Sequence, residues 1–383
     1  MIVQKVLESS GAVSWTVLGD DLLPVEPVEA YLAHLSALER SPNTLRAYAQ
    51  GLKLWMEFLQ GQRVDWAGAG VELVSRFVAW LRAPAVNVIV LDASASRRAP
   101  ATVNRHLAAV FGFYDFHARA GVALAADLVA WRRVGRGSHK PFLHHVTAGK
   151  PIATRPIKLV VPRRIPVTLT DDQVRALLAA CTRLRDRFLL ALLAETGMRI
   201  GQALGLRHAD VGSRDRVIRI VPRTDNANGA RAKTRSVHVI PVSTALIRLY
   251  SEYLHVEYGA LDSDYVFVNL FGEPVGAPLR YQAVNALVGR LRDRTGIAFT
   301  PHTLRHCHAT DLIRRGVPIE VVSKRLTHAS VSTTSSAYVH LGAEDVRAEL
   351  VRAGVWAHQG TSGDSAGGRD RPKPAAIGAG PAA

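Results

Sequence analysis

A proline-rich basic segment separates two parts of this chain. Residues 131–166 read WRRVGRGSHKPFLHHVTAGKPIATRPIKLVVPRRIP, with prolines scattered among arginines and lysines. Because proline lacks a backbone N–H and clashes with the preceding helical turn, this composition argues against a long helix or a central strand. A chain of 383 residues is also too long for one ordinary hydrophobic core. The sequence therefore predicts two domains joined by a basic linker.

The part before the linker has the periodicity of a helical domain. In SPNTLRAYAQGLKLWMEFLQ, Ser41 and Pro42 are typical of a helix start, and apolar residues then recur along one face. ATVNRHLAAVFGFYDFHARAG shows a second long helical pattern that stops at Gly121. Further helices are expected near 26–38 and 70–82. Together these patterns predict a compact four-helix unit.

The part after the linker combines helices with two short strands. In LTDDQVRALLAAC, Thr170 and Gln173 have the spacing of a capping box at a helix start. RVIRIVP and SVHVIPV are β-type runs separated by TDNANGARAKTR, which is rich in turn residues, so a hairpin or small antiparallel sheet is expected. Helical patterns resume near Thr244, and the Gly-, Ala- and Pro-rich end of the chain is expected to be disordered.

The predicted fold class is therefore mainly α with a small antiparallel β-sheet, in an α+β second domain. Five parts are expected along the chain: an N-terminal arm at 1–23, a helical domain at 24–130, the linker at 131–166, the second domain at 167–355 and a disordered tail at 356–383.

The charge balance favours a polyanionic partner. Lys and Arg number 48 against 32 Asp and Glu, which gives a formal net charge of +16 and suits nucleic acid. The two cysteines, Cys181 and Cys307, lie too far apart in sequence to suggest a disulfide framework or a CxxC metal site. The longest apolar block, FLLALLA at 188–194, is too short to span a bilayer. We expect a cytoplasmic protein with no membrane partner, associated with the nucleoid when it binds DNA.

Three segments of the second part contain candidate phosphate ligands. TGMRIGQALGLRHAD contains Arg199, PHTLRHCHATDLIRRG contains His302 and Arg305 three residues apart, and RLTHASVSTTSSAYVHL contains His328 and Tyr338. Taken singly, Arg199 is typical of a surface charge and Tyr338 of a half-buried packing residue. The spacing of His302 and His306 could suit a metal, but no carboxylate or thiolate set completes a site, so no metal is predicted.

Taken together, the three segments resemble the tyrosine recombinases, also called phage-type integrases, which include the Xer recombinases and lambda integrase. The motifs of that family are commonly written TGxRxxEALxLRWxDI, HxLRHxxAT and LGHxSxxTTxxxY. Several motifs in the same order are far more specific than any one of them. The resemblance covers about 165–355, and the helical unit before the linker is similar to the family's SAM-like core-binding domain. It implies two domains that form a clamp around DNA.

The resemblance implies a set of catalytic residues and two departures. The family's lysine lies eight positions before a proline in patterns such as GKGNKERxVPL, and counting back from Pro241 reaches Lys233. Gln202 stands where the first motif usually has an acidic residue, and Thr327 replaces the glycine before the later histidine. The implied catalytic residues are Arg199, Lys233, His302, Arg305, His328 and the nucleophile Tyr338.

The chemistry of these residue types suits attack on a DNA phosphodiester. Arginine offers forked, permanently charged donors to phosphate oxygens, histidine moves protons near neutral pH, and a lysine ammonium can protonate a leaving 5′ hydroxyl. A tyrosine nucleophile would form a 3′-phosphotyrosyl link. Because one phosphoester replaces another, the reaction needs no ATP, no metal and no cofactor.

The predicted function is a site-specific DNA recombinase or integrase of a mobile element. The alternatives are an Xer-like resolvase of chromosome or plasmid dimers, a type IB topoisomerase-like enzyme, and a catalytically silent DNA-binding regulator. The segment GAEDVRAELVRAGVWA either docks on its own domain or packs on a neighbouring subunit in a tetramer on paired sites. An accessory recombinase or directionality factor is a further possible partner. Beyond part of the linker, expected DNA contacts are Thr44, Arg46, Lys53, Arg105, Arg231 and Arg235.

Overall fold

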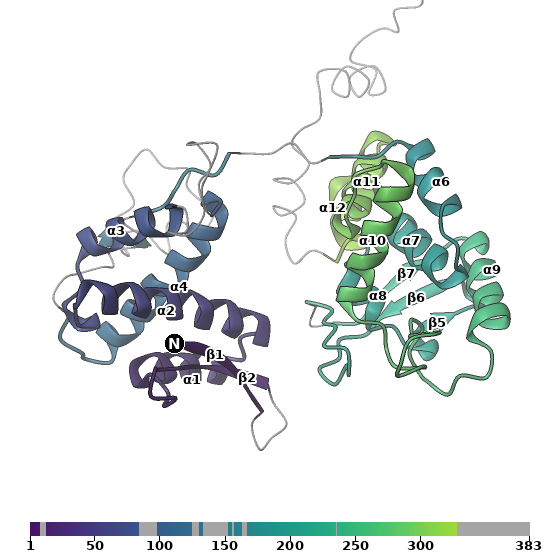
Figure 1. The fold of residues 1–383 in the computed structure, drawn as a ribbon. Helices are drawn as coiled ribbons and strands as arrows, with labels where there is room; N and C mark the ends of the chain where they lie inside the picture. The colour runs from purple at the N-terminus through teal and green to yellow at the C-terminus, as the bar shows by residue number, and fades with distance from the viewer. Residues whose placement is uncertain are drawn as a thin grey trace, which may run out of the picture. The chain divides into compact units, whose positions relative to one another are not determined.

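The computed structural model divides into two compact units, Met1–Arg163 and Arg164–Ala383. It describes residues 1–7, 13–83, 98–124, 130–132, 152–154, 157–162, 167–234 and 236–327. Both units are built mostly from helices (Figure 1). In the described residues, unit 1 also contains two two-stranded antiparallel sheets, and unit 2 contains one three-stranded antiparallel sheet. The predicted fold class is therefore confirmed.

Unit 1 contains the expected helices. Ser41 begins the longest of them as predicted, because its hydroxyl accepts a hydrogen bond from the backbone N–H of Thr44 at 3.2 Å. The described elements of this helical part are α1 (Glu26–Ala37), α2 (Pro42–Gln62), the short η1 (Trp66–Gly68), α3 (Val71–Arg82) and α4 (Pro100–Arg119).

The core of unit 1 is aromatic and joins α2 to α4. The indole N–H of Trp55 on α2 donates to the Tyr114 hydroxyl on α4 at 3.1 Å, and that hydroxyl donates to the Trp66 carbonyl at 2.7 Å. Trp55 and Tyr114 are both buried. Their polar atoms are thus paired inside the core, as a buried Trp and Tyr require.

A hairpin precedes these helices and was not predicted. Strands β1 (Ile2–Leu7) and β2 (Val13–Leu18) pair antiparallel, and Val17 is fully buried in the core of unit 1. The N-terminal arm expected at 1–23 therefore contains structure that packs on the helices. The side chain of Arg46 reaches the same hairpin, with its guanidinium carbon 5.0 Å from the centre of the Trp15 ring.

The segment expected to be a linker also contains structure. Strands β3 (Ala130–Arg132) and β4 (Ile152–Thr154) form a two-stranded antiparallel pair. Farther along the segment, the side chain of Asn104 on α4 forms two hydrogen bonds with the backbone of Leu159. Its Nδ2 donates to the Leu159 carbonyl at 2.9 Å, and its Oδ1 accepts from the Leu159 N–H at 2.8 Å. Leu159 in this segment is therefore attached to α4 of unit 1, which the proline pattern did not indicate.

In its described residues, unit 2 has a helical core and one three-stranded sheet of order β5-β6-β7 (Figure 1). The predicted capping box is present, since Thr170 and Gln173 exchange both hydrogen bonds. The predicted hairpin is β6–β7, in which Ile218 pairs with Ile240. The elements are α6 (Asp171–Ala179), α7 (Leu184–Thr196), α8 (Ile200–Leu204), η2 (His208–Asp210), β5 (Val211–Gly212), β6 (Val217–Ile220), β7 (His238–Pro241), α9 (Thr244–Tyr253), η3 (Leu254–Tyr258), α10 (Tyr281–Thr295), α11 (Pro301–Arg314) and α12 (Ile319–Arg325).

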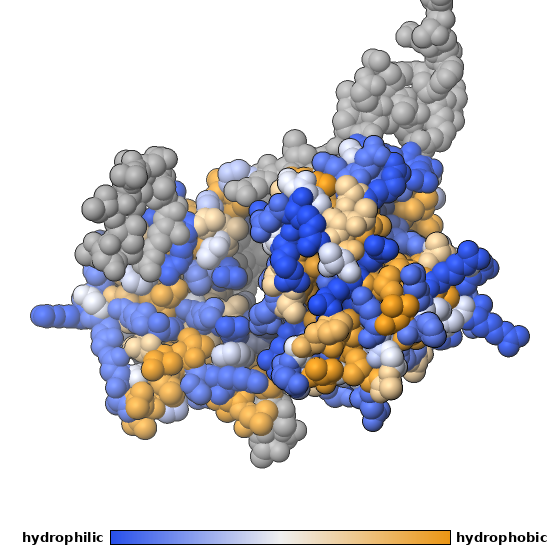
Figure 2. All heavy atoms as spheres, turned by 45° about the vertical axis from the view of Figure 1, so that its right-hand side comes forward, coloured by the Kyte–Doolittle hydropathy of each residue, from blue (hydrophilic) through white to orange (hydrophobic). Residues whose placement is uncertain are grey.

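The surface is mixed in character. Figure 2 shows hydrophilic side chains over much of the visible face, with apolar patches between them. Phe271 contributes to the exposed apolar surface, and the guanidinium carbon of Arg183 lies 3.9 Å from its ring centre. None of the described helices has the length and apolar content needed to cross a bilayer.

Candidate functional site

A glycine at the end of α7 brings three segments of unit 2 together. Gly197 has φ +62°, a left-handed conformation that favours glycine. A Cβ at this position would lie 2.7 Å from Cδ2 of His308 and 2.8 Å from Cδ2 of Leu326. Only a residue without a side chain therefore allows α11 and the end of α12 to approach the turn that precedes Arg199.

Arg305 connects the same segments from inside. Its residue exposure is 2%. Its Nη1 donates to the Gly197 carbonyl and its Nη2 to the Leu326 carbonyl, each at 2.7 Å. Both carbonyls belong to residues that cap helix C-termini, where the helix dipole leaves partial negative charge. The buried cation is thus held by two oriented carbonyl groups.

Arg199 is the N-cap residue of α8, and its side chain reaches Thr327, the residue after Leu326. Its backbone N–H donates to Oε1 of Gln202 at 2.7 Å, and its Nη1 donates to Oγ1 of Thr327 at 3.2 Å. Burial lowers the pKa of Arg199, although a guanidinium remains charged at any physiological pH. Arg199 and Arg305 therefore meet at Leu326 and Thr327, directly before His328.

His302 lies one turn before Arg305 on α11 and is exposed. The partial burial of its ring, followed by the charges of Arg305 and Arg199, lowers the pKa of His302 below its ordinary value. Its ring centre is 4.4 Å from that of His306, whose pKa falls to about 4, mainly through burial. At neutral pH both rings are therefore uncharged, and each can donate one N–H hydrogen bond.

Lys233 lies in the connection between β6 and β7. It is exposed and has φ +54°, an uncommon conformation for a residue with a side chain. The start of this connection is fastened by Arg223, whose guanidinium donates two hydrogen bonds to Asp210 at 2.7 and 2.8 Å. This ion pair positions the chain as it leaves β6.

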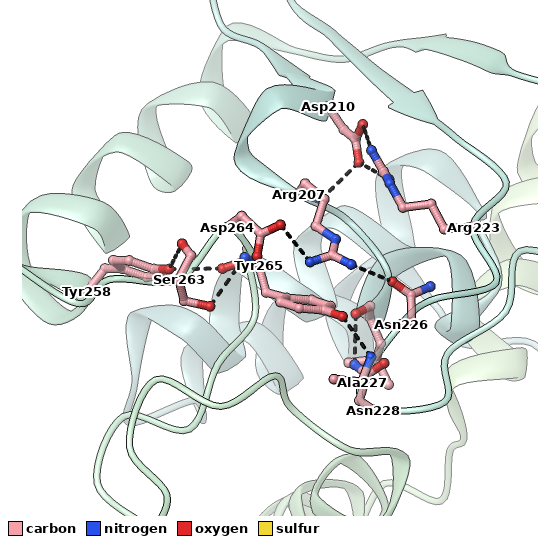
Figure 3. Close-up of polar contacts among 11 residues, drawn as sticks. Arg207, Asp210, Arg223, Asn226, Ala227, Asn228, Tyr258, Ser263, Asp264 and Tyr265 are labelled. Atoms are coloured by element: carbon pink, nitrogen blue, oxygen red, sulfur yellow. Dashed lines mark hydrogen bonds and ion pairs between the residues drawn. The ribbon is translucent and has the colours of Figure 1, made fainter. Parts of the chain in front are cut away.

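A second group of contacts holds the middle of the connection (Figure 3). The Arg207 guanidinium carbon lies 3.5 Å from the Tyr265 ring centre, and its two Nη atoms donate to Asp264 at 2.7 Å and to Asn226 at 3.1 Å. The Tyr265 hydroxyl accepts from the Ala227 N–H at 2.8 Å. Sequence reasoning did not identify these residues, and the only signal was the turn composition of TDNANGARAKTR.

The side chain of Asn228 ties the connection to two other elements. Its Nδ2 donates to the Leu204 carbonyl at the end of α8, at 3.0 Å, and to the Leu279 carbonyl at 2.9 Å. The backbone N–H of Ala230 donates back to Oδ1 of Asn228 at 3.0 Å. The connection is therefore attached to α8 at Asn228, five residues before Lys233.

The connection also touches α8 directly. A Cβ at Gly201 would lie 2.6 Å from the carbonyl oxygen of Arg231. Gly201 is two residues after Arg199, and Arg231 is two residues before Lys233. This close backbone approach places the lysine-bearing connection against the helix that begins at Arg199.

Replacing Gly201 with alanine is expected to slow DNA cleavage at least about tenfold, because the new methyl group displaces the Arg231 backbone and with it Lys233. Single-turnover cleavage assays measure the effect. Gly289→Ala on α10 is the matched control, since a Cβ there meets no atom within 4 Å. Equal cleavage rates for the two variants would show that the close approach of Gly201 and Arg231 does not position Lys233.

The structure thus brings some predicted site residues together and leaves others undecided. Arg199, His302 and Arg305 lie in one cluster, and the connection that contains Lys233 contacts α8. His328, Tyr338 and Arg235 lie outside the described residues. Within the described ranges, no three His, Cys, Asp or Glu side chains are arranged to hold a metal ion.

Two of the predicted DNA contacts of unit 1, Thr44 and Lys53, contact neighbouring residues of their own helix region. Lys53 forms an ion pair with Glu57 at 3.2 Å, and the Thr44 hydroxyl lies 2.9 Å from that of Ser41. Arg105 is exposed on α4. These residues, together with Arg46 and Arg231, remain predicted DNA contacts.

Comparisons with known proteins give one consistent assignment. Residues 167–345 match the phage integrase family, and residues 28–121 match the phage integrase N-terminal SAM-like domain. Transposase A from transposon Tn554 of Staphylococcus aureus is 40% identical over 353 residues, which is 91% of this chain and 97% of the transposase. Tyrosine recombinase XerC of Nitrobacter winogradskyi is 30% identical over 321 residues, covering 81% of this chain and 87% of XerC.

Solved structures show the same fold. The Tn1549 transposon integrase in complex with transposon right end DNA superposes with a TM-score of 0.58 at 17% identity, covering 86% of this chain and 99% of the integrase. XerH bound to palindromic difH substrate gives a TM-score of 0.54 at 18% identity and covers 88% of this chain and 89% of XerH. With its SAM-like N-terminal domain and its nearly full-length similarity to a transposase, this chain belongs to the phage integrase family of tyrosine recombinases.

Proposed function

We propose that this chain is a site-specific recombinase of a mobile element, which cuts and rejoins duplex DNA through a 3′-phosphotyrosyl intermediate. The observation that carries the proposal is the convergence of Arg199 and Arg305 on Thr327 and Leu326, directly before His328. Tyr338 follows ten residues later in the same segment. The similarity to the Tn554 transposase supports a mobile element as the source of the DNA.

The proposed reaction begins with attack by the Tyr338 hydroxyl on the scissile phosphorus. The forming bond joins the tyrosine oxygen to phosphorus, and the breaking bond joins phosphorus to the 5′ oxygen. Charge accumulates on the non-bridging oxygens, where the Arg199 and Arg305 guanidiniums and the N–H groups of His302 and His328 would stabilise it. Because its pKa is lowered, the His302 ring is uncharged at neutral pH and has an unprotonated ring nitrogen that can accept the tyrosine proton.

The leaving 5′ oxygen takes a proton from Lys233. An exposed ammonium in the fastened connection can reach a DNA strand that lies over α8. Rejoining reverses the step, with a 5′ hydroxyl attacking the phosphotyrosine while Lys233 recovers its proton. Each step exchanges one phosphoester for another, so the proposed mechanism uses neither ATP nor a metal ion.

DNA binding is proposed to involve both domains, 24–130 and 167–355, as a clamp around the duplex, with part of the linker along the DNA. The net charge of +16 supports this arrangement. We further propose a tetramer on paired sites, in the cytoplasm on the nucleoid, with an accessory recombinase or directionality factor as a possible partner. The C-terminal segment after Tyr338 would supply the contact between subunits.

Resolution of chromosome or plasmid dimers is the alternative use of the same chemistry. The similarity to XerC favours it, but the Tn554 transposase matches more of this chain at higher identity. A silent regulator is less well supported. Although Gln202 replaces the usual acidic residue, its amide oxygen still accepts the Arg199 N–H at 2.7 Å.

The test uses nicked duplexes cut from the DNA that flanks the gene, because a nick beside the scissile bond lets the cleaved end escape and traps the adduct. The wild-type chain is expected to form a covalent 3′ adduct without ATP and in the presence of EDTA. Tyr338→Phe should form none, and Tyr281→Phe, an exposed tyrosine on α10, is the control that should keep it. An adduct that persists in Tyr338→Phe would refute the assignment of the nucleophile, and one that requires a divalent cation would refute the metal-independent mechanism.

A further inference from the structure

Gln202 stands at a motif position that is usually acidic and Thr327 at one that is usually glycine, and these two residues contact each other. Nε2 of Gln202 donates a hydrogen bond to Oγ1 of Thr327 at 2.9 Å, although 125 positions separate them. Both are buried, with exposures of 3% and 7%. An amide can donate this bond while its oxygen accepts the backbone N–H of Arg199, which an ionised carboxylate cannot do. Gln202 and Thr327 are therefore joined by a hydrogen bond that depends on the amide at position 202.

Thr327 adopts a backbone conformation that is energetically unfavourable for threonine. Its φ is +55°, which lies in the left-handed region. A β-branched side chain crowds the backbone there, whereas glycine adopts this conformation without steric cost. Strain of this kind persists where the surrounding contacts hold it in place, often next to a functional site. Here the contacts are the hydrogen bonds to the threonine hydroxyl.

The same hydroxyl holds Arg199. Oγ1 of Thr327 accepts from Nη1 of Arg199 at 3.2 Å as well as from Gln202, so both of its lone pairs are used. The side-chain oxygen of Gln202 thus accepts from the backbone N–H of Arg199, and its side-chain nitrogen donates to the Thr327 hydroxyl. That hydroxyl in turn accepts from the Arg199 guanidinium. Backbone and guanidinium of Arg199 are fixed relative to each other through one buried amide.

We propose that Thr327 is a positioning residue for catalysis, whose hydroxyl, oriented by Gln202, holds the Arg199 guanidinium in the orientation that binds the scissile phosphate. The proposal rests on the proposed function, because it assigns Arg199 to that phosphate. A glycine at 327 would relieve the backbone and remove the hydroxyl, which leaves Arg199 Nη1 only its longer contact with the carbonyl of residue 327, at 3.4 Å.

Substitutions at Thr327 separate positioning from stability because two opposing effects act on stability. Thr327→Gly relieves the left-handed backbone but leaves Nε2 of the buried Gln202 without its acceptor, so its melting temperature should change little. Its cleavage should nevertheless be about 10- to 100-fold slower in a single turnover at saturating DNA. Thr327→Ser keeps the hydroxyl and should stay within about threefold of the wild-type rate. A purely structural role would make the cleavage rate follow the melting temperature. A Thr327→Gly protein that cleaves at the wild-type rate would therefore overturn the proposal.

A double variant tests whether the effect passes through Arg199. Adding Thr327→Gly to Arg199→Ala should cause no further loss of rate, because the group that Thr327 positions is already gone. A full additional loss would show that Thr327 acts independently of Arg199.

Arginine side-chain NMR tests the positioning without any DNA. Rotation of the Arg199 guanidinium about its Nε–Cζ bond should be slow in the wild type and in Thr327→Ser, and fast in Thr327→Gly. Equal rates in all three would refute the positioning. If the wild type forms no covalent adduct, the proposed function fails, while this measurement still decides whether Thr327 holds Arg199.

Discussion

Replacing Lys233 with alanine is expected to slow cleavage of an ordinary DNA phosphodiester about 100- to 10,000-fold, the usual contribution of a general acid. The 5′ alkoxide is a poor leaving group unless it is protonated as the P–O bond breaks. Lys233 lies two residues beyond the close approach of Arg231 to Gly201, and its side chain is exposed. Single-turnover cleavage of a nicked duplex measures the loss.

A change of leaving group distinguishes this role from simple charge attraction. A duplex with sulfur in place of the bridging 5′ oxygen releases a thiolate, which is stable without a proton. Lys233→Ala should therefore cleave it at nearly the wild-type rate, whereas Arg199→Ala should remain slow. Lys324→Ala, which removes an exposed lysine of α12, is the control and should cleave both substrates normally. An equal defect of Lys233→Ala on both substrates would exclude the general-acid assignment.

Replacing Arg305 with methionine is expected to destabilise unit 2 as well as abolish cleavage. The change leaves the carbonyls of Gly197 and Leu326 buried without their donors, which costs about 2 to 5 kcal/mol of unfolding free energy. Denaturation followed by circular dichroism measures this loss. Hydrogen exchange of peptides from α7 and α12 locates it.

Arg199→Ala provides the contrast, since this side chain is only partly buried and lies beside the hydroxyl of Thr327. It should lose about 100- to 1,000-fold in cleavage rate, typical of one transition-state donor, with little change in stability. The two arginines thus differ in burial: Arg305 is 2% exposed and bonds two helix-end carbonyls, whereas Arg199 is only partly buried and bonds Thr327. If Arg305→Met unfolds at the wild-type denaturant concentration, the proposed structural role of Arg305 is wrong.

Local features of the fold could be predicted because neighbouring residues determine them. The cap at Ser41 and the capping box of Thr170 and Gln173 depend on residues three positions apart, and both are present. The hairpin β1–β2 was not predicted, because its stability depends on residues such as Val17, which is buried against helices that follow later in the chain.

The candidate site shows the same division between local and distant determinants. Arg199 and Arg305 were predicted from the resemblance to the family motifs, and in the structure both side chains reach the segment Leu326–Thr327. The bond from Gln202 to Thr327 could not be predicted, because it joins residues 125 positions apart that are each unremarkable in sequence. Likewise, the contact of Arg207 with Tyr265 and Asn226 depends on how loops distant in sequence fold over one another.

Mass spectrometry of the trapped DNA adduct tests the central claim most directly. After nuclease and protease digestion, one tyrosine-containing peptide should gain the mass of a 3′-linked nucleotide. The chain contains nine tyrosines, so the assignment can fail in many ways. The account predicts that the nucleotide is attached to Tyr338 in the peptide that includes TTSSAYVHL. Attachment to any other tyrosine, or to a serine of that peptide, would contradict it.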